Sequence, residues 1–155
     1  MEDKKRLITA ILFIIMALLF TWILLPTFSF AQNSAVKIEQ AWAKPTLIGR
    51  DMGVVYLTIE NISDEARSLI AAQTDVAERT EIHTHMHGED GTMQMRQLET
   101  LELAPSAAKT FKPGGLHFML FGLKQPLKEG DEFTMTLKFD DESAEKIHVM
   151  VRENG

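Results

Sequence analysis

Beyond residue 31, the hydrophobic residues of this chain occur in short runs that alternate with polar residues. The clearest run is at residues 133–139, where Phe133, Met135, Leu137 and Phe139 fall on every second position. A period of two is typical of a β-strand with one buried face. Turn-forming residues separate the runs, and no window shows sustained helical periodicity. The pattern therefore predicts an all-β sandwich or barrel.

The same reading places strands along the whole of this region. The expected strands are Val36–Ala43, Gly53–Glu60, Arg67–Ala72, Arg79–His85, Met93–Leu98, Leu101–Leu103, Lys109–Phe111, Leu116–Phe121, Phe133–Phe139 and Lys146–Arg152. The sequence has no internal repeat and no low-complexity linker. Residues 32–155 are also long enough to bury a proper core, so we expect them to form one domain.

The start of the chain, residues 1–31, is predicted to be a targeting segment. A Lys-Lys-Arg run at residues 4–6 precedes an uncharged apolar stretch at residues 7–25, and Ser29-Phe30-Ala31 offers small residues for cleavage after Ala31. The apolar stretch could also span a bilayer, so a retained inner-membrane anchor is the alternative to a cleaved signal peptide. In either case the remainder is expected to be periplasmic or otherwise extracytoplasmic.

Charge and cysteine content exclude several functions. The chain has a formal net charge of −6, which argues against nucleic acid or anionic lipid as a partner. We expect membrane contact only through the N-terminal segment, if it is uncleaved. The chain has no cysteine. This excludes a blue-copper electron-transfer centre, which needs a thiolate ligand, and it excludes thiol–disulfide exchange.

Histidine and methionine are concentrated between residues 83 and 119, which hold four of the five histidines and four of the nine methionines. Hard cations prefer oxygen ligands, so a mixed set of imidazoles and thioethers favours copper, and Cu(I) in particular. Residues two apart on a strand share a face, so such pairs on neighbouring strands could converge. The pairs are His83 with His85, Met93 with Met95, and His117 with Met119. One such methionine alone would usually be a core residue, but the clustering favours a metal site.

The spacing within this region is also specific. His83 is followed twelve residues later by Met95, and after twenty-one intervening residues by His117 and Met119. Matching phrases surround these residues: Ala41–Pro45, Tyr56–Asn61, Glu81–His83, Met93–Arg96, Pro113–Leu120 and Leu127–Asp131. In this spacing and in these phrases the sequence resembles the PCu(A)C family of periplasmic copper chaperones, over nearly the whole of residues 32–155.

The resemblance implies a cupredoxin-like Greek-key β-sandwich that binds Cu(I) through His83, Met95, His117 and Met119. It also implies a chaperone rather than an enzyme, which delivers copper to the copper centres of cytochrome c oxidase. A Sco-type protein and an oxidase subunit would be its partners. Many family members have methionine directly after the first histidine, where this chain has Thr84, which is not a ligand position.

Further candidate ligands lie next to the predicted set and could hold a second or transient copper ion. These auxiliary candidates are His85, Met86, His87 and Met93. In contrast, His148-Val149-Met150 repeats the His-x-Met spacing without a second ligand pair nearby. Ile147, Val149 and Val151 alternate with this pair and share the more obvious core face. We therefore expect His148 and Met150 not to be ligands.

Two other functions are compatible with parts of the sequence. One is a metalloenzyme with an open coordination position, for which Glu81 is the nearest candidate general base. The other is an adhesion or assembly β-sandwich with incidental histidines and methionines. That reading leaves the ligand spacing unexplained.

Overall fold

The structure is a computed structural model, and the residues that it describes are 2, 6, 35–88 and 92–154. Of His87, only the backbone is described. Contacts divide the chain into two units, Met1–Asn33 and Ser34–Gly155. Apart from two isolated positions, the predicted targeting segment lies outside the described residues. A search of the described residues for a helix long and apolar enough to cross a membrane finds none.

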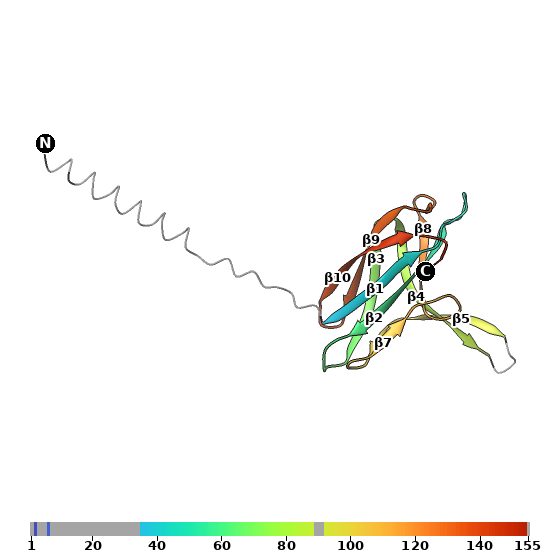
Figure 1. Cartoon of the computed structure of the whole chain (residues 1–155), viewed down its shortest axis with the longest axis horizontal. Helices are drawn as coiled ribbons and strands as arrows, with labels where there is room; N and C mark the ends of the chain where they lie inside the picture. Colours follow the sequence, from blue (N-terminus) through green and yellow to red (C-terminus); the bar gives the residue numbers. More distant parts are fainter. Residues whose placement is uncertain (1, 3–5, 7–34, 89–91, 155) are drawn as a thin grey trace. The chain divides into compact units, whose positions relative to one another are not determined.

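The described part of the second unit forms ten β-strands (Figure 1). They are β1 (Val36–Ala43), β2 (Met52–Asn61), β3 (Arg67–Thr74), β4 (Ala77–His87), β5 (Met93–Leu98), β6 (Leu101–Leu103), β7 (Ala108–Thr110), β8 (His117–Leu123), β9 (Glu132–Phe139) and β10 (Ala144–Val151). Each corresponds to a predicted strand, with ends shifted by at most two residues. The all-β fold predicted from alternation is therefore confirmed.

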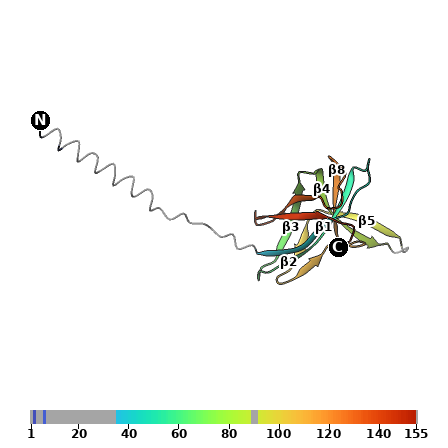
Figure 2. The same ribbon diagram turned by 45° about the horizontal axis from the view of Figure 1, so that its top comes forward.

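Hydrogen bonds join the strands in the order β5-β4-β8-β2-β1-β10-β9-β3-β6, and β7 pairs with β2. In the described part, β1 and β10 pair in parallel and the other pairs are antiparallel. Buried residues from both halves of this sheet form one hydrophobic core. The arrangement is the predicted cupredoxin-like β-sandwich (Figures 1 and 2).

The core is built from the alternating residues that predict the strands. In β9, Phe133, Met135, Leu137 and Phe139 are all buried. In β8, Phe118 has no exposed surface, and its ring stacks on that of the residue just after β7, Phe111, with centres 4.4 Å apart. Because neighbouring side chains on a strand point to opposite faces, the burial of Phe118 directs the side chains on either side of it away from the core.

Asn61, at the end of β2, is a buried polar residue that ties several segments together. Its side-chain Nδ2 donates hydrogen bonds to the carbonyl oxygens of Glu65, Leu103 and Ala104, at 2.7, 3.0 and 3.2 Å. Its Oδ1 accepts bonds from the backbone N–H and the hydroxyl of Ser63. A buried amide with this many partners stabilises the connection between β2 and the end of β6.

The strands β4 and β5 continue beyond the rest of the sheet. Pairing between β4 and β8 ends at His83, whereas pairing between β4 and β5 continues to His87. Residues 84–87 and their partners in β5 therefore form a two-stranded ribbon, which projects past the other strands in both views (Figures 1 and 2). This extension explains why β4 ends two residues later than predicted. Its earlier start, at Ala77, comes from pairing with β8.

Candidate metal-binding site

The predicted ligands lie on three neighbouring strands, with β4 between β5 and β8. His83 of β4 is directly opposite His117 of β8, and their ring centres are 5.8 Å apart. Glu81 is likewise opposite Met119. Residues directly opposite one another project from the same face of a sheet. This face is the one that points away from the core, because the side chain of Phe118 occupies the other.

The pairing of β4 with β5 adds the remaining predicted ligand. Met95 is directly opposite His85, and it is therefore a diagonal neighbour of His83. Met119 is the other diagonal neighbour of His83, on β8. Diagonal neighbours are about 7–8 Å apart, a distance that a methionine side chain can span. The register therefore makes His83 the middle of the predicted set.

His117 is held in a defined protonation state. Its side chain is 3% exposed, and its Nδ1 lies 2.9 Å from the carbonyl oxygen of Gly115. A carbonyl can only accept, so Nδ1 carries the proton and Nε2 is left for a metal. Burial lowers the pKa of His117, the Gly115 bond opposes this, and the neighbouring imidazoles of His85 and His83 lower the pKa further. The imidazole is therefore neutral at pH 7, the form that binds a metal.

His83 is oriented by a carboxylate. Its Nε2 donates to Oε2 of Glu81 at 2.8 Å, and Oε1 of Glu81 accepts from Nε of Arg79 at 2.7 Å. The other ring nitrogen of His83, Nδ1, is buried and has no hydrogen-bond partner among the described residues. A carboxylate on one imidazole nitrogen and an unpartnered second nitrogen are typical of a metal-binding histidine.

Glu81 is thus a functional residue whose role sequence reasoning missed. The sequence presents Glu81 as a candidate general base, whereas in the structure both of its carboxylate oxygens accept hydrogen bonds. The available signal was its spacing, because a carboxylate two residues before His83 on a strand shares that residue's face. The Gly115 carbonyl was also missed, since a backbone group leaves no trace in residue identity.

The auxiliary candidates differ in how they relate to the predicted set. Nδ1 of His85 is buried and unpartnered within the described structure, and its ring centre is 5.2 Å from that of His117. Met93 lies opposite His87 in the ribbon. Met86 alternates with His85 and therefore belongs to the other face. Both methionines are about half exposed, at 55% for Met93 and 46% for Met86.

Met119 can also be approached from the side away from β5. Together with Lys44, Arg50 and Met52 it lines a hollow of about 270 Å³. The loop at this hollow exposes Leu47, which is 75% accessible. Met119 is therefore partly buried and adjoins this hollow.

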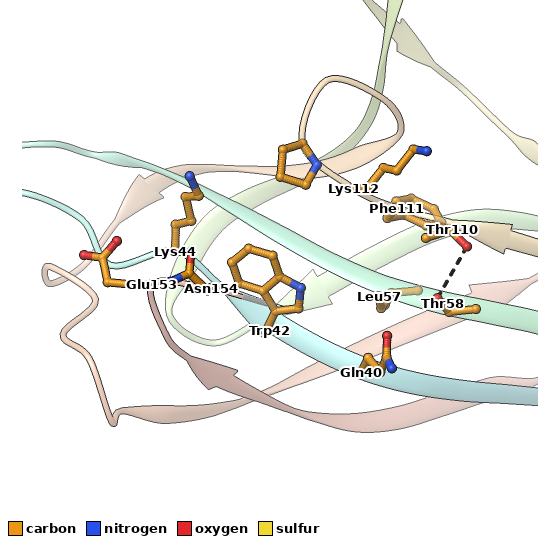
Figure 3. Close-up of a pocket in the computed structure, with 11 residues that line it drawn as sticks. Gln40, Trp42, Lys44, Leu57, Thr58, Thr110, Phe111, Lys112, Glu153 and Asn154 are labelled. Atoms are coloured by element: carbon orange, nitrogen blue, oxygen red, sulfur yellow. Dashed lines mark hydrogen bonds between the residues drawn. The ribbon is translucent and has the colours of Figure 1, made fainter.

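The turn before β8 positions His117. It is closed by hydrogen bonds from the Gly115 N–H to the Lys112 carbonyl and from the Lys112 N–H to the Leu116 carbonyl. Gly114 has a φ of 75°, which favours glycine. Lys112, Pro113, Thr110 and Trp42 are among the residues that line a groove of about 390 Å³ (Figure 3). The histidines and methionines of the predicted site are not among the residues that line this groove.

The second His-x-Met pair is placed as expected. His148 and Met150 are exposed on β10, while Val149 and Val151 are buried. Among residues 35–88 and 92–154, no group of three or more His, Cys, Asp or Glu side chains could hold a metal ion.

Comparison with known proteins identifies the family. A family model described as "LpqE-like: Putative lipoprotein LpqE-like" matches residues 36–151. The chain belongs to the LpqE-like family. This LpqE-like protein is similar to "Putative lipoprotein Lxx21020" of Leifsonia xyli subsp. xyli, with 27% identity over 123 residues that cover 79% of this chain and 72% of the relative.

Solved structures with the same fold are PCuAC domains. The "Copper-bound PCuAC domain from PmoF2" matches with a TM-score of 0.65 and 23% sequence identity. The match covers 76% of this LpqE-like chain and 92% of the PmoF2 domain, and it shows a shared fold. The solution structure of "CuI-DR1885" from Deinococcus radiodurans has a TM-score of 0.59 and 28% identity, and covers 80% of this chain and 84% of its own. The resemblance to the PCu(A)C family that the sequence predicts is confirmed.

Proposed function

We propose that this protein is an extracytoplasmic copper chaperone that binds one Cu(I) through His83, Met95, His117 and Met119. One observation carries the proposal. His83 has a buried Nδ1 without a hydrogen-bond partner among the described residues, and it lies opposite His117, whose Nε2 is left for a metal. Met95 and Met119 are both diagonal neighbours of His83. The similar structures include a copper-bound PCuAC domain and CuI-DR1885, which supports this choice of metal.

The chemistry of these four ligands suits a protein that must hold copper and then release it. Thioethers bind soft Cu(I) without carrying a proton, so release requires no protonation of sulfur. Zn²⁺ should bind more weakly, because it prefers thiolate, imidazole and carboxylate ligands. Met95 is 50% exposed, which would let a partner approach the bound copper.

The destination of the copper is proposed from the family resemblance. Residues 1–31 would export the protein, either as a cleaved signal peptide or as a retained anchor, and residues 32–155 would form the copper-binding domain. A relative named as a lipoprotein supports a place outside the cytoplasm. Delivery would then be to the copper centres of cytochrome c oxidase, with a Sco-type protein and an oxidase subunit as partners.

A metalloenzyme is less well supported by the same geometry. Glu81 would have to act as the general base, but its two oxygens accept bonds from His83 and Arg79. A carboxylate held in this way orients a ligand and is poorly placed to take a proton from water. We therefore propose binding and delivery without turnover.

Titration with Cu(I) against a colorimetric chelator, under anaerobic conditions, tests this proposal. Purified residues 32–155 should take up one equivalent of Cu(I), and the same sample should show no turnover in oxidase and hydrolase assays. His117→Ala should weaken binding strongly, while His148→Ala, the same change at an exposed position, should not. Failure of the wild-type protein to compete with the chelator would refute the proposal.

A further inference from the structure

We propose that copper has a second position in this protein, further out along the β4–β5 ribbon, formed by His85, Met95 and His117. The inference rests on the proposed function, because it concerns the same ion and shares two of the same ligands. It assigns to His85 the role of an alternative to His83 rather than that of a ligand to a separate copper ion.

The distances favour His85 as a partner of His117. Their ring centres are 5.2 Å apart, compared with 5.8 Å for His83 and His117. Two imidazoles that share one tetrahedral ion, each with its nitrogen about 2.0 Å from the metal, have ring centres about 5.2 Å apart. His85 therefore meets His117 at least as well as His83 does.

The surroundings of His85 supply the other donors. Met95 is directly opposite His85 in the β4–β5 register, whereas it is only diagonal to His83. Nδ1 of His85 is buried without a hydrogen-bond partner in the described residues. A buried polar nitrogen without a partner is costly, and binding an ion would remove that cost.

The two positions exclude each other. Nδ1 of His117 donates to the Gly115 carbonyl, so Nε2 is the one nitrogen of His117 that can bind copper. A single nitrogen cannot serve two ions, and copper held with His83 must leave that position before it is held with His85. The protein therefore binds one copper ion that exchanges between two overlapping positions.

The outer position has one ligand fewer than the inner one. Met119 lies opposite Glu81, which is four residues before His85 on β4, so Met119 cannot follow copper outward. Three protein ligands leave one coordination position open, and half of the Met95 side chain is exposed beside it. A soft donor from a copper acceptor can enter that open position, which makes the outer position the point of transfer.

A double-mutant cycle tests the overlap, because an alternative ligand shows its value only when the first is absent. Cu(I) affinity would be measured by chelator competition on residues 32–155, since Ser34–Gly155 is a unit with its own core. We expect His85→Ala alone to change the affinity by less than about threefold and His83→Ala alone to lower it about tenfold. The double variant should lose at least about 300-fold. His148→Ala, made in both backgrounds, is the matched control.

X-ray absorption of the His83→Ala protein gives an independent readout. The copper should keep both nitrogen and sulfur neighbours, with two nitrogens supplied by His85 and His117. Thermal unfolding of each apo variant checks that the fold is intact, and His→Gln versions replace any variant that unfolds.

The results separate the two proposals. If His85→Ala has the same small effect with and without His83, or if His83→Ala alone is as damaging as the double variant, the outer position does not exist. If the wild-type protein itself binds no Cu(I), the proposed function fails and the outer position fails with it.

Discussion

Replacing Glu81 with alanine should weaken Cu(I) binding although Glu81 is not itself a ligand. Its Oε2 accepts the Nε2–H of His83, which fixes the tautomer in which Nδ1 can bind copper. Without the carboxylate, the ring of His83 can rotate or take up the other tautomer. Copper binding then has to fix the orientation of the His83 ring, and this reduces the Cu(I) binding free energy.

The size of the effect follows from the contact. The hydrogen bond is 2.8 Å long, and the side chains of His83 and Glu81 are 12% and 15% exposed, so water screens the pair only weakly. Loss of a carboxylate that orients a metal-binding histidine typically costs 10–100-fold in metal affinity. We therefore expect Glu81→Ala to lose about 1.4–2.7 kcal/mol of Cu(I) binding free energy. Glu81→Gln should lose less, because an amide oxygen can still accept the bond.

Chelator competition on the wild type, Glu81→Ala and Glu81→Gln would measure this difference directly. Glu102→Ala is the matched control, because Glu102 is an exposed carboxylate on β6, outside the β4–β5–β8 group. If Glu81→Ala stays within about threefold of the wild type, as Glu102→Ala should, the orienting role of the carboxylate is wrong.

The structure supports four further predictions. The double variant His148→Ala, Met150→Leu should leave Cu(I) affinity within about threefold of the wild type, under about 1 kcal/mol. The double variant His117→Ala, Met119→Leu should lower the affinity at least about 100-fold, or about 2.7 kcal/mol. Equal losses would show that His117 and Met119 are the wrong His-x-Met pair. Cu(I) affinity should weaken below about pH 6, because both imidazoles must be neutral to bind. Burial lowers the pKa of His117, so the unfolded state takes up this proton first. The contribution of His117 to the stability of the apo protein is therefore complete above about pH 6.5 and decreases as the pH falls. Urea unfolding of His117→Gln should lack this part of the pH dependence. Asn61→Ala should lower the free energy of unfolding by about 2–3 kcal/mol, because three carbonyls lose a donor; an unchanged unfolding midpoint would contradict this.

The strands were predictable because their signal is local. In β9, Phe133 and Met135 alternate with polar residues, and the same alternation reports burial in the structure. The spacing of His117 and Met119 likewise requires only the geometry of a single strand. Burial of Val149 between His148 and Met150 followed from the same rule.

The pairing between strands was not predictable from local pattern. Nothing in the sequence indicates that Met95 lies opposite His85 rather than His83, because the register of β4 and β5 depends on the hairpin between them and on the core. The carbonyl of Gly115 and the partners of Asn61 are also long-range or backbone features. The family spacing predicts which residues belong to the site, and the register shows which of them are neighbours.

X-ray absorption spectroscopy of the Cu(I)-loaded wild-type protein tests the two-His, two-Met site. We expect the copper to have nitrogen neighbours from His83 and His117 and sulfur neighbours from Met95 and Met119. The sulfur contribution should decrease in Met119→Leu and persist in Met150→Leu. A shell of nitrogen and oxygen alone, with no sulfur neighbour, would contradict the two-His, two-Met site.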